Sequence, residues 1–256
     1  SQTNLPINKI IKELEVMGVT VDLNINVFEM EIPVQREIER IGNYYTVSFS
    51  PKIHSFKQIF FKRVMDIVGA IVGLLITGIV TVFLAPALLI ESPGPLFFSQ
   101  VRVGKNGRRF KIYKFRSMYM DAEERKKELM SQNEMEGLMF KMENDPRVTK
   151  VGKFIRKTSI DELPQFWNIL KGEMSLVGTR PPTEDEFLQY EGYHRRRLNM
   201  TPGLTGLWQV SGRSDTKNFE EIVAMDVEYI DNWSLKEDIK ILFKTVGVVL
   251  KGKGAS

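Results

Sequence analysis

Apolar residues fill one long stretch of the chain almost without interruption. From Val64 to Ile90 the sequence reads VMDIVGAIVGLLITGIVTVFLAPALLI, and Asp66 is the one charged residue within it. As a straight helix this stretch would extend about 40 Å, more than the roughly 30 Å of a bilayer's hydrocarbon core. Core helices of soluble proteins seldom run so far without a polar face. The pattern therefore predicts contact with a membrane, with a buried core helix as the alternative.

Basic residues flank this apolar run on both sides. Lys57, Lys62 and Arg63 precede it, and the segment 92–120 that follows contains no acidic residue but carries Arg102, Lys105, Arg108, Arg109, Lys111, Lys114 and Arg116. Because Lys and Arg gather on the cytoplasmic side of membrane helices, two basic flanks favour a re-entrant helix over a plain span, which is the alternative. A re-entrant helix needs a break, for which Gly78 and Pro86 are the candidates. Asp66 is expected at the interface or bonded to backbone groups near that break.

Periodic patterns also mark the two ends of the chain. Apolar residues recur at helical spacing from Ile7 to Met17, and Val19–Ile25 alternates as a strand does. These two elements form half of an α/β repeat, so we expect residues 1 to about 50 to be the tail of an upstream domain. Near the other end, helical spacing predicts one helix around Ile222–Ile230 and a second around Ile239–Leu250.

The composition excludes several kinds of site. The 256-residue chain has a net charge of +4 and no cysteine, which excludes disulfides, thiolate metal sites and thiol nucleophiles. His54 and His194 lack any metal-ligand spacing. The run YHRRR, Tyr193–Arg197, is typical of a solvated basic surface, with contact to lipid phosphates as the alternative. Trp208 is expected to pack in the interior, with stacking on a substrate as the alternative.

Basic and aromatic residues alternate in LFFSQVRVGKNGRRFKIYKFRSMYM, which follows the apolar run. This composition is compatible with nucleic acid, with anionic lipid head groups or with a pyrophosphate. The apolar neighbour makes nucleic acid the weakest of these interpretations. Within the segment, Asn106-Gly107 predicts the turn of a β-hairpin.

Two adjacent carboxylates, Asp161 and Glu162, lie in RKTSIDELPQFWNILKGEMSLVGTRP. The spacing Ser159-x-x-Glu162 matches a capping box, in which the acids would only stabilise a helix N-terminus. Pro164 argues against this interpretation, because it lies too deep for the first turn. The alternative is chemical: a carboxylate can attack phosphorus or bind Mg²⁺. Cations for phosphate groups are near in sequence, at Arg147, Lys150, Lys153, Arg156, Lys157 and Arg180.

Four blocks in order resemble the bacterial sugar transferase family of monotopic polyprenyl-phosphate phosphoglycosyl transferases. They are KRVMDIVGAIVGLL, PLFFSQVRVGKNGRRFKIYKFRSM, DPRVTKVGKFIRKTSIDELPQFWNILKGEMSLVGTRP and PGLTGLWQVSGR, and the likeness runs from about Phe61 to Gly252. The resemblance implies an α/β, α-rich, membrane-associated catalytic domain with a re-entrant membrane helix, preceded by a fragment of a Rossmann-like domain. The implied divisions are 1–55 for that fragment and its linker, 56–95 for the membrane helix and 96–256 for the catalytic domain.

The resemblance also implies a reaction on the cytoplasmic side of the cell's inner membrane, with a UDP-sugar, undecaprenyl phosphate and the lipid bilayer as partners and a homo-oligomer as a possibility. Asp161 would attack the β-phosphorus of the UDP-sugar and expel UMP, and undecaprenyl phosphate would then take the sugar phosphate, glucose 1-phosphate being our expectation. Glu162 would bind Mg²⁺ together with Asp161. The implied phosphate contacts are Lys114, Arg116, Arg147, Arg156, Arg180 and Arg213, with Lys114 and Arg180 the strongest candidates. This would be the first membrane step of capsular or exopolysaccharide synthesis.

The chain departs from the family pattern at two places. Thr77-Gly78-Ile79 stands where the family has a Ser-Pro break, so the position of the break is open, and Thr179 replaces a proline in the loop before Arg180. Two other functions remain as alternatives: a Mg²⁺-dependent membrane phosphodiesterase or pyrophosphatase, and a membrane scaffold without catalysis.

Overall fold

The computed structural model of the chain describes residues 35–41, 44–50, 55–129, 142, 145–211 and 218–251. The chain divides into two compact units, Ser1–Ile53 and His54–Ser256.

The first unit contains a β-hairpin that the sequence patterns did not predict. Strands β1 (Gln35–Ile41) and β2 (Tyr44–Ser50) pair antiparallel, with Gln35 opposite Ser50. The helix and strand predicted between Ile7 and Ile25 lie outside the described residues. The assignment of residues 1–55 to a Rossmann-like domain therefore stays a prediction.

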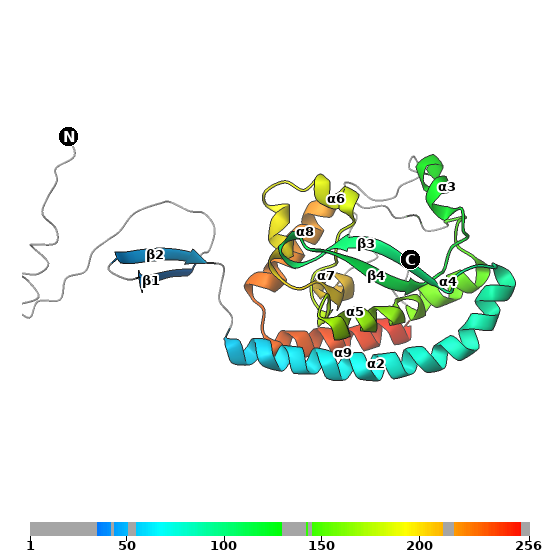
Figure 1. Ribbon diagram of the computed structural model, residues 1–256, viewed down its shortest axis with the longest axis horizontal. Helices are drawn as coiled ribbons and strands as arrows, with labels where there is room; N and C mark the ends of the chain where they lie inside the picture. The colour runs from blue at the N-terminus through cyan, green and yellow to red at the C-terminus, as the bar shows by residue number, and fades with distance from the viewer. Residues whose placement is uncertain are drawn as a thin grey trace, which may run out of the picture. The chain divides into compact units, whose positions relative to one another are not determined.

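The second unit is helix-rich, with two small sheets (Figure 1). Its elements in chain order are α2 (Phe56–Glu91), β3 (Phe97–Val103), the 3₁₀ turn η1 (Lys105–Gly107), β4 (Arg109–Phe115), α3 (Ala122–Leu129), α4 (Lys150–Lys157), η3 (Ile160–Gln165), α5 (Phe166–Lys171), β5 (Ser175–Val177), α6 (Glu184–Leu188), η4 (His194–Asn199), β6 (Gly203–Thr205), α7 (Leu207–Ser211), α8 (Phe219–Asp231) and α9 (Leu235–Lys251). Helices α8 and α9 confirm the two C-terminal helices that apolar spacing predicts.

The two sheets differ in strand direction and in location. Strands β3 and β4 form the predicted antiparallel hairpin, and its turn needs left-handed backbone at Asn106 (φ 57°) and Gly107 (φ 77°). Strands β5 and β6 pair parallel and lie in the main hydrophobic core, where Met174, Leu176 and Val177 pack with Ile241 of α9.

Helix α2 lies along the second unit and buries one stripe of side chains against it. The buried residues are three, four or seven positions apart and so share one helix face: Lys62, Asp66, Ala70, Gly73, Thr77, Leu84 and Leu88. Of its most apolar 18-residue window only 17% is buried, which rules out the core-helix alternative. In the part of the chain that the structure describes, α2 is the one helix long and apolar enough to cross a membrane.

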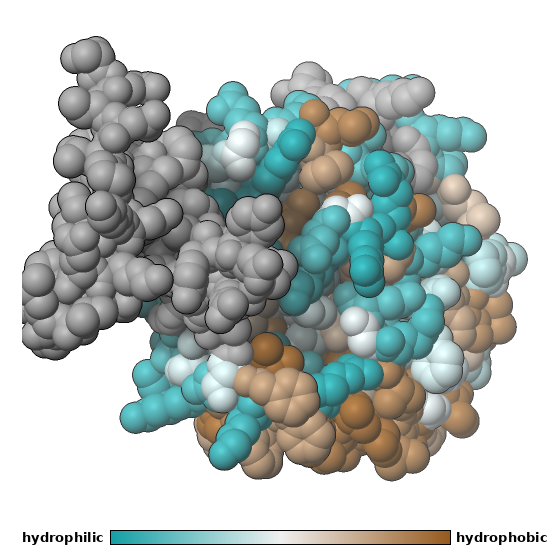
Figure 2. All heavy atoms as spheres, turned by 60° about the vertical axis from the view of Figure 1, so that its left-hand side comes forward, coloured by the Kyte–Doolittle hydropathy of each residue, from teal (hydrophilic) through white to brown (hydrophobic). Residues whose placement is uncertain are grey.

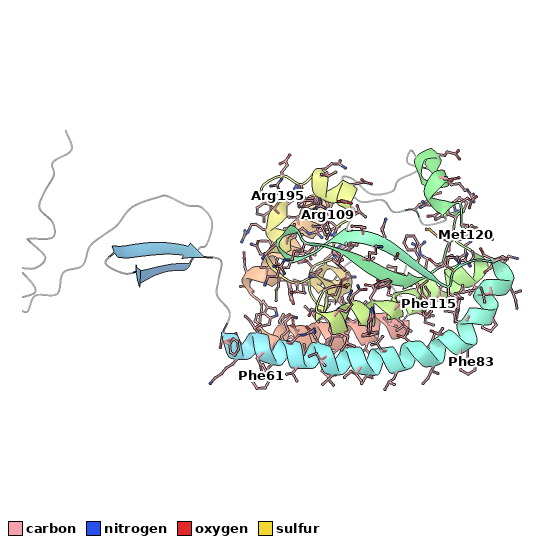
Figure 3. The ribbon with its side chains drawn as sticks, viewed as in Figure 1. Phe61, Phe83, Arg109, Phe115, Met120 and Arg195 are labelled. Atoms are coloured by element: carbon pink, nitrogen blue, oxygen red, sulfur yellow. The ribbon has the colours of Figure 1, made fainter. Side chains whose placement is uncertain are left out.

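The other side of α2 is an exposed apolar surface. Phe61 and Phe83, both labelled in Figure 3, are 57% and 78% exposed, and Ile90 is 84% exposed. Figure 2 shows hydrophobic residues gathered along the lower edge of the second unit, where α2 runs in Figure 1. Arg109 and Arg195 lie across the unit from this edge (Figure 3). Exposed apolar area of this extent marks a surface that contacts lipid or protein.

The predicted break in this helix is a curve in the structure. Helix α2 continues through both Gly78 and Pro86, and it bends beyond Phe83 (Figures 1 and 3). Proline lacks the amide hydrogen and clashes with the preceding turn, so Pro86 accounts for a bend without ending the helix. The structure has one continuous helix across both candidate positions, and the break of a re-entrant path through a bilayer stays a prediction.

Buried polar contacts hold α2 to the rest of the second unit. Lys62 Nζ lies 2.6 Å from Asp238 Oδ2 of α9 and donates to Val177 O at 2.9 Å. Asp66 accepts from the Ser175 hydroxyl and the Leu176 amide, both at 2.9 Å. These contacts satisfy charges that would otherwise be costly in the interior.

Glycine positions on α2 predict opposite effects of one substitution. In Gly73→Ala, the added methyl would lie 2.3 Å from the Phe166 ring of α5, and we expect a loss of about 1–3 kcal/mol from overpacking. At Gly78 nothing lies within 4 Å, so Gly78→Ala is expected to gain up to about 1 kcal/mol from helix propensity. Thermal unfolding of both variants in detergent measures the contrast. Equal shifts would contradict the packing of α2 on α5.

Removing one member of the buried pair is expected to be severe. Lys62→Met leaves Asp238 charged and buried, which costs about 3–5 kcal/mol in comparable pairs. The control is Lys240→Met, which removes an exposed lysine 2.7 Å from Glu237 and is expected to change stability by about 0.5 kcal/mol or less. A Lys62→Met protein as stable as this control would show that the pair does not hold α2 in place.

Candidate functional site

The acid pair lies on a short 3₁₀ segment that follows a well-capped helix. At the start of α4, the Thr149 side chain accepts from Gly152 N, and Glu91 accepts from the Lys150 and Val151 amides at 2.6 and 2.8 Å. After α4 the chain turns at Ser159, which has left-handed backbone (φ 56°), and η3 begins. Such a conformation is unfavourable for a residue other than glycine and is often found at functional sites.

The capping-box alternative was wrong. Ser159 makes no side-chain cap bond, and the segment that it precedes is 3₁₀ rather than α-helical. A left-handed residue directs its side chain away from the amides that an N-cap must reach. The capping box that does form lies at Thr183 and Glu186, at the start of α6. Helix capping therefore does not account for the acids at 161 and 162.

Both carboxylates share one ammonium group. Lys114 Nζ of β4 lies 2.8 Å from Glu162 Oε1 and 3.9 Å from Asp161 Oδ2. The Asp161 side chain is 11% exposed and that of Glu162 20%, so both carboxylates are mostly buried. The hairpin and η3 pack closely, which brings residues 48 positions apart into contact. Lys114, a predicted phosphate contact, thus lies at the acid pair.

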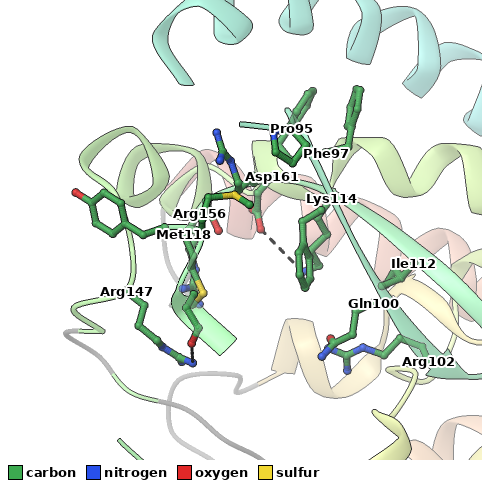
Figure 4. Close-up of a pocket in the computed structure, with 17 residues that line it drawn as sticks. Pro95, Phe97, Gln100, Arg102, Ile112, Lys114, Met118, Arg147, Arg156 and Asp161 are labelled. Atoms are coloured by element: carbon green, nitrogen blue, oxygen red, sulfur yellow. Dashed lines mark hydrogen bonds and ion pairs between the residues drawn. The ribbon is translucent and has the colours of Figure 1, made fainter. Parts of the chain in front are cut away.

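Asp161 lines a cavity of about 370 Å³ (Figure 4). Its apolar wall includes Phe97 and Phe115, whose rings stack with centroids 5.3 Å apart. Four of the six predicted phosphate contacts line the same cavity: Lys114, Arg116, Arg147 and Arg156. A carboxylate among this many cations is suited to an anionic ligand, because the cations can bind phosphate oxygens by charge-assisted hydrogen bonds.

Backbone and side-chain hydrogen bonds hold two of these arginines, Arg116 and Arg147, in place. Tyr119 N donates to Arg147 O at 2.9 Å, and Thr149 N donates to Ser117 O at 3.1 Å. Arg116 donates to the carbonyls of Ser92 and Pro93, which join α2 to β3. The side chain of Arg147 is bound by Asp145 through contacts of 2.6–3.2 Å. Arg147 therefore brings little net charge to the cavity that it lines.

The other two predicted phosphate contacts are Arg180 and Arg213. Arg180 is not among the residues that line this cavity; its guanidinium lies 3.3 Å from Glu186 Oε2. Arg213 lies outside the described residues, so its role stays a prediction.

The sequence interpretation missed Gln100 and Arg102, which line the cavity from β3. Figure 4 places them on the other side of Asp161 from Arg147. Arg102 Nη2 donates to Gln100 Oε1 at 2.7 Å, and Arg102 Nε is buried without a partner in the described part of the chain. Burial and the nearby Arg180 lower the pKa of Arg102 to about 10, so an anionic ligand would stabilise this cation. Alternation along a strand, which puts residues 100 and 102 on one face, was the available signal.

The acid pair suits a metal that also binds the substrate. Among the described residues, no group of three or more His, Cys, Asp or Glu side chains could hold a metal alone. Mg²⁺, however, is usually held by one or two carboxylates together with substrate phosphates. Asp161 and Glu162 fit that smaller requirement.

Comparison with known proteins gives a family. The family described as bacterial sugar transferase matches residues 57–252. The chain is 53% identical over 249 residues to galactosyl transferase CpsE of Streptococcus agalactiae serotype III (strain NEM316), covering 97% of this chain and 55% of that protein. It is 46% identical to undecaprenyl-phosphate galactose phosphotransferase of Salmonella typhimurium (strain LT2), covering 77% of this chain and 42% of the relative.

A relative with another sugar in its name matches almost as well. UDP-glucose:undecaprenyl-phosphate glucose-1-phosphate transferase of Escherichia coli (strain K12) is 44% identical, over 72% of this chain and 39% of its own length. The chain thus spans about half the length of these three relatives, or less.

The pair of Asp145 with Arg147 predicts a pH-dependent stability. Burial opposes the charge of Asp145, but hydrogen bonds from Arg147 outweigh it and lower the pKa of this carboxyl. A lowered folded-state pKa contributes stability above the unfolded value, and the contribution is lost as pH falls through the folded value. Asp145→Asn is therefore expected to lower the unfolding midpoint at pH 7, with the gap to wild type closing below about pH 4. A gap that stays constant from pH 7 downward would contradict the ion pair.

Proposed function

The chain belongs to the bacterial sugar transferase family, and we propose that it transfers a sugar 1-phosphate from a UDP-sugar to undecaprenyl phosphate. The names of two of its relatives indicate the class of sugar donor and lipid acceptor. The observation that carries the proposal is Asp161, a nearly buried carboxylate beside Lys114, in a cavity lined by arginines. The reaction would be the first membrane step of capsular or exopolysaccharide synthesis.

In the first step, Asp161 acts as the nucleophile. One of its oxygens forms a bond to the β-phosphorus of the UDP-sugar, and the bond from that phosphorus to the bridging oxygen breaks. UMP leaves with that oxygen and its electron pair, and the sugar phosphate stays on Asp161 as an acyl phosphate. Lys114, Arg116 and Arg156 neutralise the phosphate oxygens, which lowers the repulsion between an anionic nucleophile and an anionic substrate.

In the second step, undecaprenyl phosphate takes the sugar phosphate. An oxygen of the lipid phosphate forms a bond to the same phosphorus, and the bond to Asp161 breaks, which restores the carboxylate. The bond between the sugar and its phosphate stays intact throughout. Supporting this step is the exposed apolar side of α2, which can contact the bilayer that holds the lipid substrate.

Mg²⁺ would be held by Glu162 and Asp161 together with substrate oxygens, and when bound it would supply positive charge at the pyrophosphate. The chain's own cations act at the same place, since Lys114 contacts both acids.

We further propose that the apolar helix enters the bilayer from the cytoplasmic side of the inner membrane and returns to it, as the basic flanks of α2 favour.

The test is UMP release by detergent-solubilised protein with Mg²⁺, from UDP-glucose and from UDP-galactose. Each donor is assayed with and without undecaprenyl phosphate. Without lipid, wild type is expected to release about one UMP per enzyme, and lipid is expected to produce continuous turnover. Asp161→Asn is expected to lower turnover by about a thousandfold or more, because the covalent nucleophile is lost.

Asp185→Asn, which changes an exposed aspartate on α6, is the matched control and is expected to stay active. Full activity of Asp161→Asn would refute the assignment of the nucleophile. Continuous UMP release without lipid would favour the phosphodiesterase or pyrophosphatase. If neither UDP-sugar released UMP, the protein would use another donor or would be the non-catalytic scaffold. The preferred sugar is read from the same assay, with glucose as the expectation.

A further inference from the structure

A second cavity, of about 300 Å³, lies beside Glu162. Its walls come from segments far apart in the chain and are largely apolar, with Leu204 of β6, Val210 of α7 and Leu242 of α9 among them. The volume is at the low end of the range for ligand sites, about 300–1,000 Å³. An apolar cavity of this kind does not suit a nucleotide or a sugar, whose many polar groups would be left without partners.

One end of this cavity reaches the exposed apolar surface. Val246 and Val249 of α9 line the cavity, yet they are 57% and 40% exposed. Phe243, one turn earlier on α9, is 76% exposed. Helix α9 packs beside α2, and the two run together along the same edge of the unit in Figure 1. An apolar ligand can therefore enter from the exposed side of α9, next to α2.

The other end of the cavity reaches the acid pair. Glu162 lines this second cavity, whereas Asp161 lines the first one. Lys114, which lines the first cavity, contacts both carboxylates at 2.8 and 3.9 Å, so this cation lies next to the acid that lines the second cavity. Lys157 also lines the second cavity and adds positive charge near Glu162. A ligand with an apolar tail and an anionic head would match both ends.

We propose that this second cavity binds the first isoprene units of the polyprenyl phosphate acceptor, with the phosphate directed to Lys114. The proposal rests on the proposed function, since it locates the acceptor of that reaction. It separates the two substrates in space: the UDP-sugar occupies the cavity of Asp161, and the lipid approaches from the side of Glu162. The lipid phosphate then reaches the phosphorus on Asp161 without passing through the nucleotide site.

The experiment fills the second cavity and measures each half-reaction separately. Leu242→Trp obstructs its wall, and Val246→Trp obstructs its exposed mouth, where a larger side chain is compatible with folding. The matched control is Leu188→Trp, because Leu188 of α6 is 73% exposed and does not line the cavity. The readouts are the UMP burst from UDP-sugar without lipid and the KM for undecaprenyl phosphate. Thermal unfolding in detergent checks that each variant is folded.

Both cavity variants are expected to keep the burst and to raise the KM for undecaprenyl phosphate by about tenfold or more, since apolar burial of the lipid is lost. The control is expected to match wild type in both readouts. An unchanged KM in folded Val246→Trp would overturn the inference and leave the proposed function standing. Loss of its burst would also overturn it, because the cavity would then serve the donor. A wild-type protein without burst or lipid-dependent turnover would refute the proposed function itself.

Discussion

The buried contact of Lys62 with Asp238 determines how the rest of the second unit is arranged. Neither charge can be exposed to lipid at low cost, so the face of α2 that carries Lys62 and Asp66 must lie against the protein. The opposite face, with its exposed apolar side chains, is then directed outward. Asp238 also accepts hydrogen bonds from Tyr229 and Trp233, so the pair extends into the core. The contact thus fixes the rotation of the apolar helix about its axis.

The same helix positions the candidate catalytic segment. Its last residue, Glu91, accepts from two amides at the start of α4, and α4 leads through Ser159 to the acid pair. Nearer the middle of α2, Thr77 Oγ1 lies 3.2 Å from Leu163 O in η3. Thr77 stands where the family has its Ser-Pro break, and in this chain the position joins the helix to the segment that carries Asp161. The exposed apolar surface and the candidate catalytic segment are therefore both held by contacts of one helix.

The sequence predicted the elements better than their long-range contacts. Asn106-Gly107 gave the hairpin, and apolar spacing gave α8 and α9, because turn geometry and helix periodicity are local properties. The family motif named Asp161 and Lys114 as site residues, and the structure places both at one cavity that the sequence did not predict. The YHRRR run was predicted to be solvated, yet Arg197 is buried against Asp226 at 2.7 Å; a partner 29 positions away leaves no local signal. The neutralised Arg147 and the Arg102 site were not predicted either, although their partners Asp145 and Gln100 each lie only two positions away in the sequence.

Gly69 and Gly73 allow α2 to approach the core closely, because a methyl group at either position would overlap Leu176 or Phe166. Few atoms therefore separate the outward apolar side chains from the segment that bears the acid pair. If the proposed function holds, this short separation affects how the two substrates reach the site. A water-soluble nucleotide and a lipid can reach the same two carboxylates while each remains in its own phase, so neither must be carried across the boundary between them.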